Sequence, residues 1–497
     1  MSHKILRNIS EKVRSESKQF GVIVDGTTDI TGTEQECICI RYVDADLHVH
    51  EDFIGLYNVA ETKGEALCHM TEDVLIRLQL PLHDLRAQAY DGASNMAGIY
   101  NGCQAIVKKK QPLALYVHCG AHISHLVCSK AINAAPFVRD AIDLIKELGR
   151  LYKQSGKFKR LYFEESPVSK LKPICPTRWL TRSSAIKSSL DNYSSVLETL
   201  KKASEEFGTE TSARANNLYK ALQKGTSILG LVAGQTVVDI LERFNKSLQG
   251  PTTTVSGMIE AAASVKEMLN SLRNDEEFHK VFCNATEIIT SNDLEPLKMP
   301  RKRKVPIRYD TESSSYQAES VENYFRVHYF AMIDSALQHL QDYFCSTDLE
   351  TYRKLCCVLM QGSVEKDVIC AYPELKYEAL TLELPFFRRQ YRFSSLDEMR
   401  LIMKGLSKEV RVMFSEVEKL LRLLLISPAS SCTAERSFSS LRRLKSWLRN
   451  SMKQERLNSL MVCHTHKDIL ESVSIESIAQ EFIDCSPDRR RDVFGKY

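Results

Sequence analysis

The stretch FGVIVDGTTD, residues 20–29, decides the fold of this chain. Its centre, Val22-Ile23-Val24, is apolar and β-branched, which is typical of a buried strand. The Gly26-Thr27-Thr28 segment interrupts this run and predicts that Asp25 lies at the end of the strand. An Asp before Gly is also common in turns, where its carboxylate accepts local backbone hydrogen bonds, so Asp25 alone does not define a site.

Two more apolar runs follow the first. They occupy residues 37–43 (CICIRYV) and 48–59, and short polar connectors at 31–34 and 44–46 separate the runs. This spacing predicts an antiparallel meander of three strands.

A helix and a fourth strand come next. Apolar residues recur at helical spacing within residues 63–80, and the segment 84–91 then reads as a strand that ends in Asp91. A crossover helix returns the chain parallel to an earlier strand. If the fourth strand pairs with the first, Asp25 and Asp91 meet at the same edge of the sheet. Asp29 is a further acid nearby, which turn or capping chemistry also explains.

A third acid lies far downstream, in ISPASSCTAERSFS at residues 426–439. Pro428 and the serines end a Leu-rich helix, and a new helix is predicted to begin near Ser431 or Thr433, whose hydroxyls suit an N-cap. Glu435 then falls in the first turn, where the helix dipole favours negative charge. A capping glutamate is the alternative interpretation.

Two carboxylates on neighbouring strands and a distant third would form a pocket for two divalent metal ions. A pocket of this kind catalyses phosphoryl transfer on nucleic acid. Residues 436–456 hold seven Lys or Arg and one acid, Glu455, beside an apolar stripe. Such a segment packs on one side and meets phosphates on the other. A solvated amphipathic helix is the competing interpretation.

Composition limits the classes of protein that remain. The 497 residues suffice for two or three domains, and a net charge of +4 means that nucleic-acid binding must rest on local patches. Fifteen scattered cysteines indicate reduced thiols inside the cell. We find no secretory signal, and the apolar segment 227–238 is too short to cross a membrane. The RKRK cluster at 301–304 is either a nuclear localisation signal or a basic loop.

The middle of the chain, residues 119–406, is mostly helical in pattern, with amphipathic segments at 137–152, 184–207 and 255–272. Residues 293–320 turn polar and charged, which predicts an exposed loop. No fixed-period repeat occurs, so we do not expect a solenoid.

Five motifs now stand in order: DGTTD at 25–29, DGASNM at 91–96, CGAH at 119–122, RW at 178–179 and SCTAERSFS at 431–439. With these motifs the chain resembles the hAT superfamily of DNA transposases, especially its zinc-finger MYM-like, transposon-derived branch. The resemblance covers nearly the whole chain, and the AERSFS segment is its most specific part.

The resemblance implies an α/β fold: a ribonuclease-H-like mixed sheet core interrupted by a large all-α insertion domain. Residues 1–118 would form the first part of the core, 119–410 the insertion, and 411–497 the rest of the core and the dimerisation region.

The resemblance also assigns residues. The catalytic and metal-binding residues, for Mg²⁺ or Mn²⁺, would be Asp25, Asp91 and Glu435. The DNA-binding residues would be Arg178, Trp179, Arg436, Arg442, Arg443 and Lys445, with Trp179 either stacked on a base or anchored in the core.

The family motif matches Cys119 and His122, which we expect to have a structural or DNA-facing role. These two residues, with His125 and Cys128, are spaced by threes along one predicted helix and do not easily close a tetrahedral zinc site.

The leading functional hypothesis is a nuclear, dimeric hAT-type transposase that cuts and joins DNA with a divalent metal. One alternative is a domesticated, catalytically inactive descendant that acts in DNA-linked regulation or interaction, and another is a metal nuclease without strand transfer. Two positions depart from the family pattern: Thr27 replaces a common Trp, and His125 replaces a common Asn. Family members usually bear an N-terminal zinc finger, so we expect either a fragment or a host protein derived from a transposon.

Overall fold

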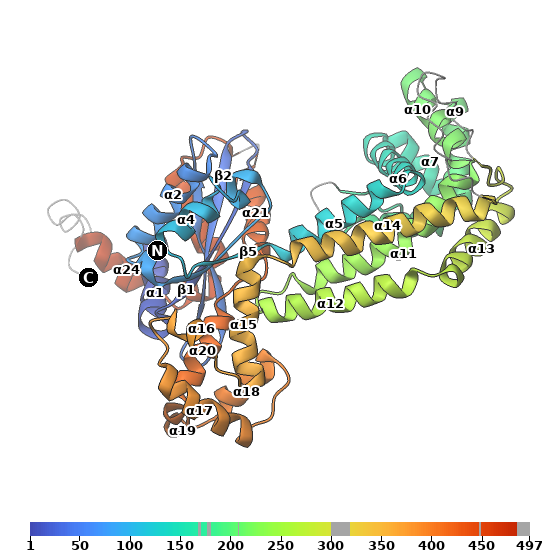
Figure 1. Ribbon diagram of the computed structural model, residues 1–497. Coiled ribbons are helices and arrows are strands. Elements are labelled where there is room, and N and C mark those ends of the chain that lie inside the picture. The colour runs from blue at the N-terminus through green and yellow to red at the C-terminus, as the bar shows by residue number, and fades with distance from the viewer. Residues whose placement is uncertain (167–169, 176–179, 207, 300–318, 447–448, 485–497) are drawn as a thin grey trace. The chain divides into compact units, whose positions relative to one another are not determined.

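A computed structural model describes residues 1–166, 170–175, 180–206, 208–299, 319–446 and 449–484 (Figure 1). The chain divides into two compact units, which we describe separately. The first comprises Met1–His122, Leu248–Ile259 and Cys345–Tyr497, and the second comprises Ile123–Ser247 and Glu260–Phe344. Arg178, Trp179 and the basic cluster at 301–304 lie outside the described residues.

The first unit contains a five-stranded mixed sheet in the order β3-β2-β1-β4-β5. The meander pairs antiparallel, β1 with β2 and β2 with β3, whereas β4 runs parallel to both β1 and β5. The predicted meander and the predicted parallel return are therefore confirmed. The strands span β1 Phe20–Thr28, β2 Glu34–Val43, β3 Val49–Asn58, β4 Leu85–Tyr90 and β5 Leu115–His118.

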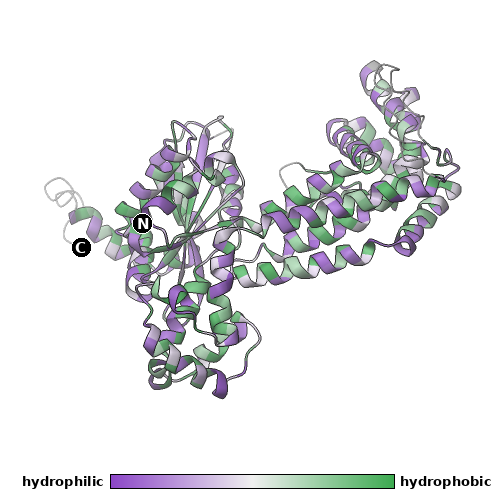
Figure 2. Ribbon diagram, in the orientation of Figure 1, coloured by the Kyte–Doolittle hydropathy of each residue, from purple (hydrophilic) through white to green (hydrophobic). Residues whose placement is uncertain are grey.

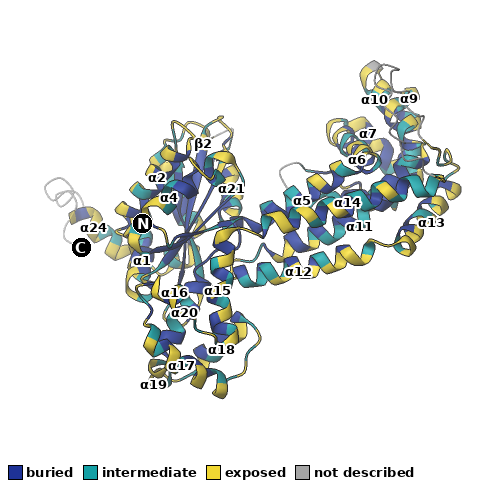
Figure 3. Ribbon diagram, in the orientation of Figure 1, coloured by how far each residue is buried: buried dark blue, intermediate teal, exposed yellow. Residues whose placement is uncertain are grey.

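Helices surround this sheet, and Figure 3 shows the strands as the buried centre of the unit. Helices α21 and α22 pack against β3, and α21 also contacts β1 and β2. The helices of this unit are α1 Ser2–Lys12, the π-helix η1 Val13–Ser17, α2 Gly64–Arg77, the 3-10 helix η2 Leu82–Asp84, α3 Ser94–Ala97, α4 Cys103–Lys110, α15 Thr347–Gln361, α16 Lys366–Cys370, α17 Tyr377–Gln390, α18 Leu396–Gly405, α19 Lys408–Met413, α20 Ser415–Leu425, α21 Cys432–Leu444, α22 Gln454–Thr465, α23 Lys467–Glu471 and α24 Ile475–Asp484.

The described part of the second unit is helical, and its helices show alternating apolar and polar bands in Figure 2, as expected of helices with one buried face. It contains α6 Pro136–Gln154, α7 Gly156–Glu165, α8 Arg182–Leu190, α9 Tyr193–Glu206, α10 Thr209–Leu222, α11 Gly225–Ser247, α13 Asp275–Ser291 and α14 Val321–Tyr343, and the unit boundary falls within α5 Gly120–Ala134 and α12 Val255–Leu272. No described helix has the length and hydropathy needed to cross a membrane.

Helix α11 shows how closely these helices pack. A Cβ at Gly230 would lie only 2.4 Å from the carbonyl oxygen of Phe137 on α6, so only glycine permits this approach. The apolar segment at 227–238 is thus a packed helix core. The helix predicted at 184–207 is divided into α8 and α9.

Two sequence-based expectations need correction. Asp25 does not end its strand, because β1 continues through Thr28 by pairing with β2, with Thr28 opposite Glu34. Its parallel pairing with β4 nevertheless stops at Ile23, so Asp25 lies just beyond that shared edge. The predicted insertion ended at residue 410, but α15 to α19 group with the sheet, as does the segment Leu248–Ile259.

Arg41 on β2 joins distant segments of the first unit. It is fully buried, and its guanidinium forms an ion pair with Glu51 on β3. It also donates to three carbonyl oxygens, at 2.9 Å to Leu425, 2.9 Å to Pro251 and 3.1 Å to Thr253. A buried charge needs this full set of partners. One side chain therefore binds the 248–259 segment and the C-terminal part of the chain to the sheet.

We predict that Arg41→Met lowers the free energy of unfolding by about 3–5 kcal/mol, because it leaves Glu51 buried without its cation and three carbonyls without a donor. Urea unfolding followed by circular dichroism measures the change. Arg7→Met is the control, since it removes an exposed ion pair with Glu481 and should cost under about 1 kcal/mol. Equal losses in the two variants would contradict this role of Arg41.

Candidate functional site

The loop before α21 is fixed by bonds to the residues that follow β5. The backbone N–H of Gly120 donates to the carbonyl oxygen of Ala429 at 3.0 Å. The N–H of Ser431 donates to the thiol sulfur of Cys119 at 3.2 Å. Cys119 is fully buried, so this bond is shielded from water. The first residue of the CGAH motif thus positions the start of α21.

A second set of bonds holds the first turn of α21. The hydroxyl of Thr433 donates to the carboxylate of Glu51, whose other oxygen is paired with Arg41. The hydroxyl of Ser430 donates to the carbonyl oxygen of Leu248 at 3.0 Å. Helix α21 begins at Cys432 after Ser431, with Glu435 in its first turn, which confirms the predicted helix start.

These constraints bring Glu435 beside Asp25. A side-chain hydrogen bond with Asp25 lowers the pKa of Glu435, against the larger opposing effect of burial. The hydroxyl of Ser431 lies 3.4 Å from a carboxyl oxygen of Asp25, so the predicted N-cap residue contacts the acid instead of capping the helix. A buried acid and a half-buried acid from opposite ends of the chain therefore lie side by side.

The electrostatics include Asp91. Burial raises the pKa of Asp25 well above its ordinary value, and the negative charges of Glu435 and Asp91 raise it further. Burial likewise raises the pKa of Glu435 to about 9, with additional contributions from Cys119 and Asp91. The three acids are thus within electrostatic reach of one another, and their mutual repulsion makes the site favour bound protons or a cation.

Asp91 itself also has a local partner. Its carboxylate accepts a hydrogen bond from the N–H of Ala93 at 3.1 Å, which is the turn interaction expected of an Asp at this position. The hydroxyl of Tyr116 donates to its carbonyl oxygen at 3.3 Å. Turn chemistry and proximity to the other acids therefore coexist at Asp91.

The chemistry of this site fits a divalent metal ion, but the present arrangement of its side chains does not. Carboxylate oxygens are the ligands that Mg²⁺ and Mn²⁺ prefer, and a dication would relieve the repulsion that raises the pKa of Asp25. Within the described part of the chain, however, no group of three or more His, Cys, Asp or Glu side chains is arranged to hold a metal ion. The type of donor and the charge fit, whereas joint coordination requires the carboxyl groups to turn from their present partners.

One further acid was missed by the sequence analysis. Glu36 on β2 lies opposite Gly26, is 4% exposed, and has a pKa raised to about 7 by burial and then by Glu34 and Asp91. It belongs to no motif, and its place opposite Gly26 and the effect of Asp91 on its pKa are visible only in the fold.

Cys119 and His122 are both near the acids in structure. Burial raises the pKa of Cys119, but hydrogen bonds from Cys432 and Ser431 outweigh it and lower the pKa to about 6. Burial lowers the pKa of His122, although the nearby charge of Asp91 opposes this. A structural role for Cys119, through its bond to Ser431, follows directly from this geometry.

The predicted DNA-contacting residues of α21 differ in exposure. Arg436, Arg442 and Arg443 are exposed, and Arg436 donates to the carbonyl oxygen of Gln249 at 2.7 Å. Lys445 is buried, and its ammonium pairs with Asp29 at 2.5 Å. Lys445 stays a predicted DNA contact, although its ammonium already pairs with a buried carboxylate.

Comparisons with known proteins agree with this architecture. Residues 1–102 match a family described as "ZMYM1/FAM200, RNase-like domain", and residues 401–468 match one described as "hAT family C-terminal dimerisation region". Both matches fall in the unit that contains the mixed sheet. The predicted ribonuclease-H-like α/β fold is confirmed, and so is the predicted resemblance to hAT-type proteins over these two segments.

Two curated relatives carry the name "52 kDa repressor of the inhibitor of the protein kinase". The human protein is 24% identical over 93% of this chain and 63% of its own length, and the mouse protein is 24% identical over 93% and 64%. The chain thus spans less than two thirds of the length of these relatives.

We predict that Asp29→Asn lowers the free energy of unfolding by about 2 kcal/mol at pH 7. Burial alone would raise the pKa of Asp29, but Lys445 and hydrogen bonds from Thr31 and Thr33 outweigh it and lower the pKa from 3.8 to about 2. A carboxyl group with a lowered pKa stabilises the fold above its unfolded-state pKa, and this contribution is lost as the pH falls toward 2.

Urea unfolding at pH 7 and at pH 3 measures this dependence. The difference between wild type and Asp29→Asn should be smaller at pH 3. A double variant, Asp29→Asn with Lys445→Met, removes the unpaired ammonium and separates that cost from the loss of the ion pair. A difference that is the same at both pH values would contradict the lowered pKa.

Proposed function

We propose that this relative of the hAT transposases acts in the nucleus as a DNA-binding dimer, and that Asp25, Asp91 and Glu435 support divalent-metal-dependent cleavage and joining of DNA. The observation that carries the proposal is the convergence of these acids. Ser431, four residues before Glu435, is separated from Asp25 by 406 residues in the chain and contacts it in the fold. Functional sites are where carboxylates with raised pKa values, such as Asp25 and Glu435, concentrate.

The chemistry follows from the donor set. Phosphodiester cleavage needs an activated water and a stabilised leaving oxygen, and two bound Mg²⁺ or Mn²⁺ ions supply both. The three carboxylates would hold the metal. Asp25 on β1 is buried near the start of α21, which hydrogen bonds to Cys119 and Glu51 hold in place. Positioning of this kind limits the motion needed for reaction.

The basic side chains lie on the same helix as Glu435. Arg436, Arg442 and Arg443 are exposed on α21, so a DNA strand bound along this helix would pass close to the acids. Contacts of this type position the backbone without reading sequence. Arg178 and Trp179 remain predicted contacts.

A second function is favoured by specific observations. Asp25 and Glu435 bond to each other, Asp91 bonds to its own turn, and no three-ligand group occurs among the described residues. The curated relatives are named as repressors. These facts support a catalytically inactive, transposase-derived regulator that keeps the fold, the dimer and the DNA-binding face.

The first experiment incubates the purified chain with Mg²⁺ or Mn²⁺ and either a DNA hairpin or a nicked duplex. We predict cleavage and joining that Asp91→Ala reduces roughly 10³-fold, because residues that act as a unit lose most activity when one is removed. Glu455→Ala is the matched control, since it removes an exposed acid and should leave the rate unchanged.

The possible outcomes separate the candidate functions. DNA binding by the wild type without cleavage, unchanged in Asp91→Ala, would exclude the enzyme and favour the regulator. Cleavage without joining would indicate a nuclease.

The second experiment tests self-association. Val412 and Met413 on α19 are 74% and 68% exposed and lie within the segment that matches the dimerisation region. Exposed apolar side chains in such a segment suit an interface. We predict that Val412→Asp shifts the full chain from dimer to monomer in analytical ultracentrifugation. Ile76→Asp, also 74% exposed but outside the matched segments for dimerisation, should leave the dimer intact. A monomeric wild type would contradict the proposal.

A further inference from the structure

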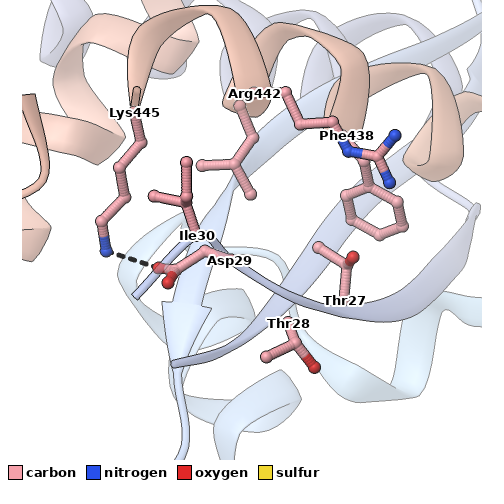
Figure 4. A pocket seen from close by; sticks show the side chains of 8 residues that line it. Thr27, Thr28, Asp29, Ile30, Phe438, Arg442 and Lys445 are labelled. Atoms are coloured by element: carbon pink, nitrogen blue, oxygen red, sulfur yellow. Dashed lines mark hydrogen bonds and ion pairs between the residues drawn. The ribbon is translucent and has the colours of Figure 1, made fainter. Parts of the chain in front are cut away.

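A pocket of about 240 Å³ lies between β1 and α21, beside the acids but separate from them. Its walls include Thr27, Thr28 and Asp29 from the strand and Phe438, Arg442 and Lys445 from the helix (Figure 4). We infer that this pocket binds one backbone unit of a DNA strand, with the phosphate on Arg442 and Thr27 and the deoxyribose against Phe438. The inference rests on the proposed DNA-binding function and assigns a subsite to it.

The charge of the pocket favours an anion. Asp29 is the one acid among the residues that line it, and the ammonium of Lys445 neutralises it at 2.5 Å, with both side chains almost fully buried. Hydrogen bonds from Thr31 and Thr33 engage the same carboxylate. The guanidinium of Arg442 is exposed and has no hydrogen-bond or ion-pair partner among the described residues. The lining therefore carries one uncompensated positive charge at its mouth.

The other walls suit the remaining parts of a nucleotide backbone. The hydroxyl of Thr28 is engaged, because it donates to Glu34 at 2.7 Å. The hydroxyl of Thr27 makes no hydrogen bond to another described residue, so it is available to donate to a phosphate oxygen. Phe438 and Leu441 form an apolar wall on the helix side, against which the C–H groups of a sugar can pack. Figure 4 shows Phe438, Arg442 and Lys445 extending from α21 toward the strand.

The position of the pocket relative to the acids follows from the side-chain periodicities of the strand β1 and the helix α21. Asp25 and Thr27 are two residues apart on a strand, so both side chains point to the same face, about 7 Å apart along it. Glu435 and Phe438 are three residues apart on a helix and lie on the same side of it. The pocket is thus the next position along the β1–α21 groove after the acids. A separation of about 7 Å corresponds to about two base-pair steps along the axis of a DNA duplex.

Arg443 provides a matched comparison. It has the same charge, is also exposed, and follows Arg442 directly on α21, but it does not line the pocket. Both arginines are predicted DNA contacts, so loss of either should weaken binding. The subsite requires that only Arg442 holds one particular phosphate.

The experiment measures binding of the full chain to a fluorescent DNA duplex by anisotropy over a range of salt concentrations. Arg442→Gln should weaken binding about tenfold and reduce the salt slope by about one, as expected for loss of one phosphate contact. Thr27→Val should weaken binding about fivefold, since it removes one hydrogen bond. Arg443→Gln should also weaken binding and lower the salt slope, because Arg443 is a predicted DNA contact. Arg389→Gln, at an exposed position on α17, should leave the affinity unchanged.

Phosphate ethylation interference then locates the contact. One ethylated phosphate should block the wild type and have no further effect on Arg442→Gln. An ethylation pattern that Arg442→Gln and Arg443→Gln change in the same way would overturn the subsite while leaving DNA binding in place. No binding by the wild type would overturn the proposed function, and the subsite with it. Thermal unfolding of each variant verifies that the fold is retained.

Discussion

The candidate site depends on one packing constraint, which is that the N-terminus of α21 must lie against β1. Gly120 and Cys119 bind the loop before the helix, and Thr433 binds Glu51, which in turn pairs with Arg41. These partners come from strands and loops far apart in the chain. Because buried charges and buried backbone groups require their partners, the constraint fixes the helix start with little freedom. The location of Glu435 follows from it.

Asp25 on β1 and Asp29 in the turn after it are both buried, but their surroundings shift their pKa values in opposite directions. Asp29 is paired with Lys445, and its pKa is lowered to about 2, so it stabilises the fold as an anion. Asp25, four residues earlier, has no cation beside it among the residues that the structure describes, and its pKa is raised by burial and by two other acids. Burial of this kind costs stability. The contrast identifies Asp25, and not Asp29, as the acid whose surroundings lack a positive charge.

The sequence predicted the features that arise from local patterns. The meander of β1 to β3, the parallel return of β4 and the position of Glu435 in the first turn of its helix all follow from apolar runs, crossover handedness and turn residues. The sequence analysis did not predict β5. The continuation of β1 beyond Asp25 was missed because pairing with β2 outweighs the Gly-Thr-Thr signal for a break. The grouping of α15 to α19 with the sheet depends on tertiary packing, which helical periodicity does not report.

The details of the site were less predictable. Lys445 looked like a DNA contact because it stands in a basic segment, and only the fold shows that its partner is Asp29. Glu51 and Glu36 belong to no motif. Glu51 contacts Thr433 of α21, and the charge of Asp91 raises the pKa of Glu36, so only the fold shows that both lie near the site. The hydrogen bond from Ser431 to Cys119 explains why a cysteine stands at the start of the CGAH motif, a role that spacing does not reveal.

The most direct test of the central claim is a titration of Mn²⁺ into the full chain, followed by electron paramagnetic resonance. If the three acids form a cation site, the wild type binds Mn²⁺, Asp25→Asn and Glu435→Gln each lose that binding, and Glu455→Gln keeps it. Equal Mn²⁺ binding by the wild type and Asp25→Asn, or none by the wild type, would contradict the account.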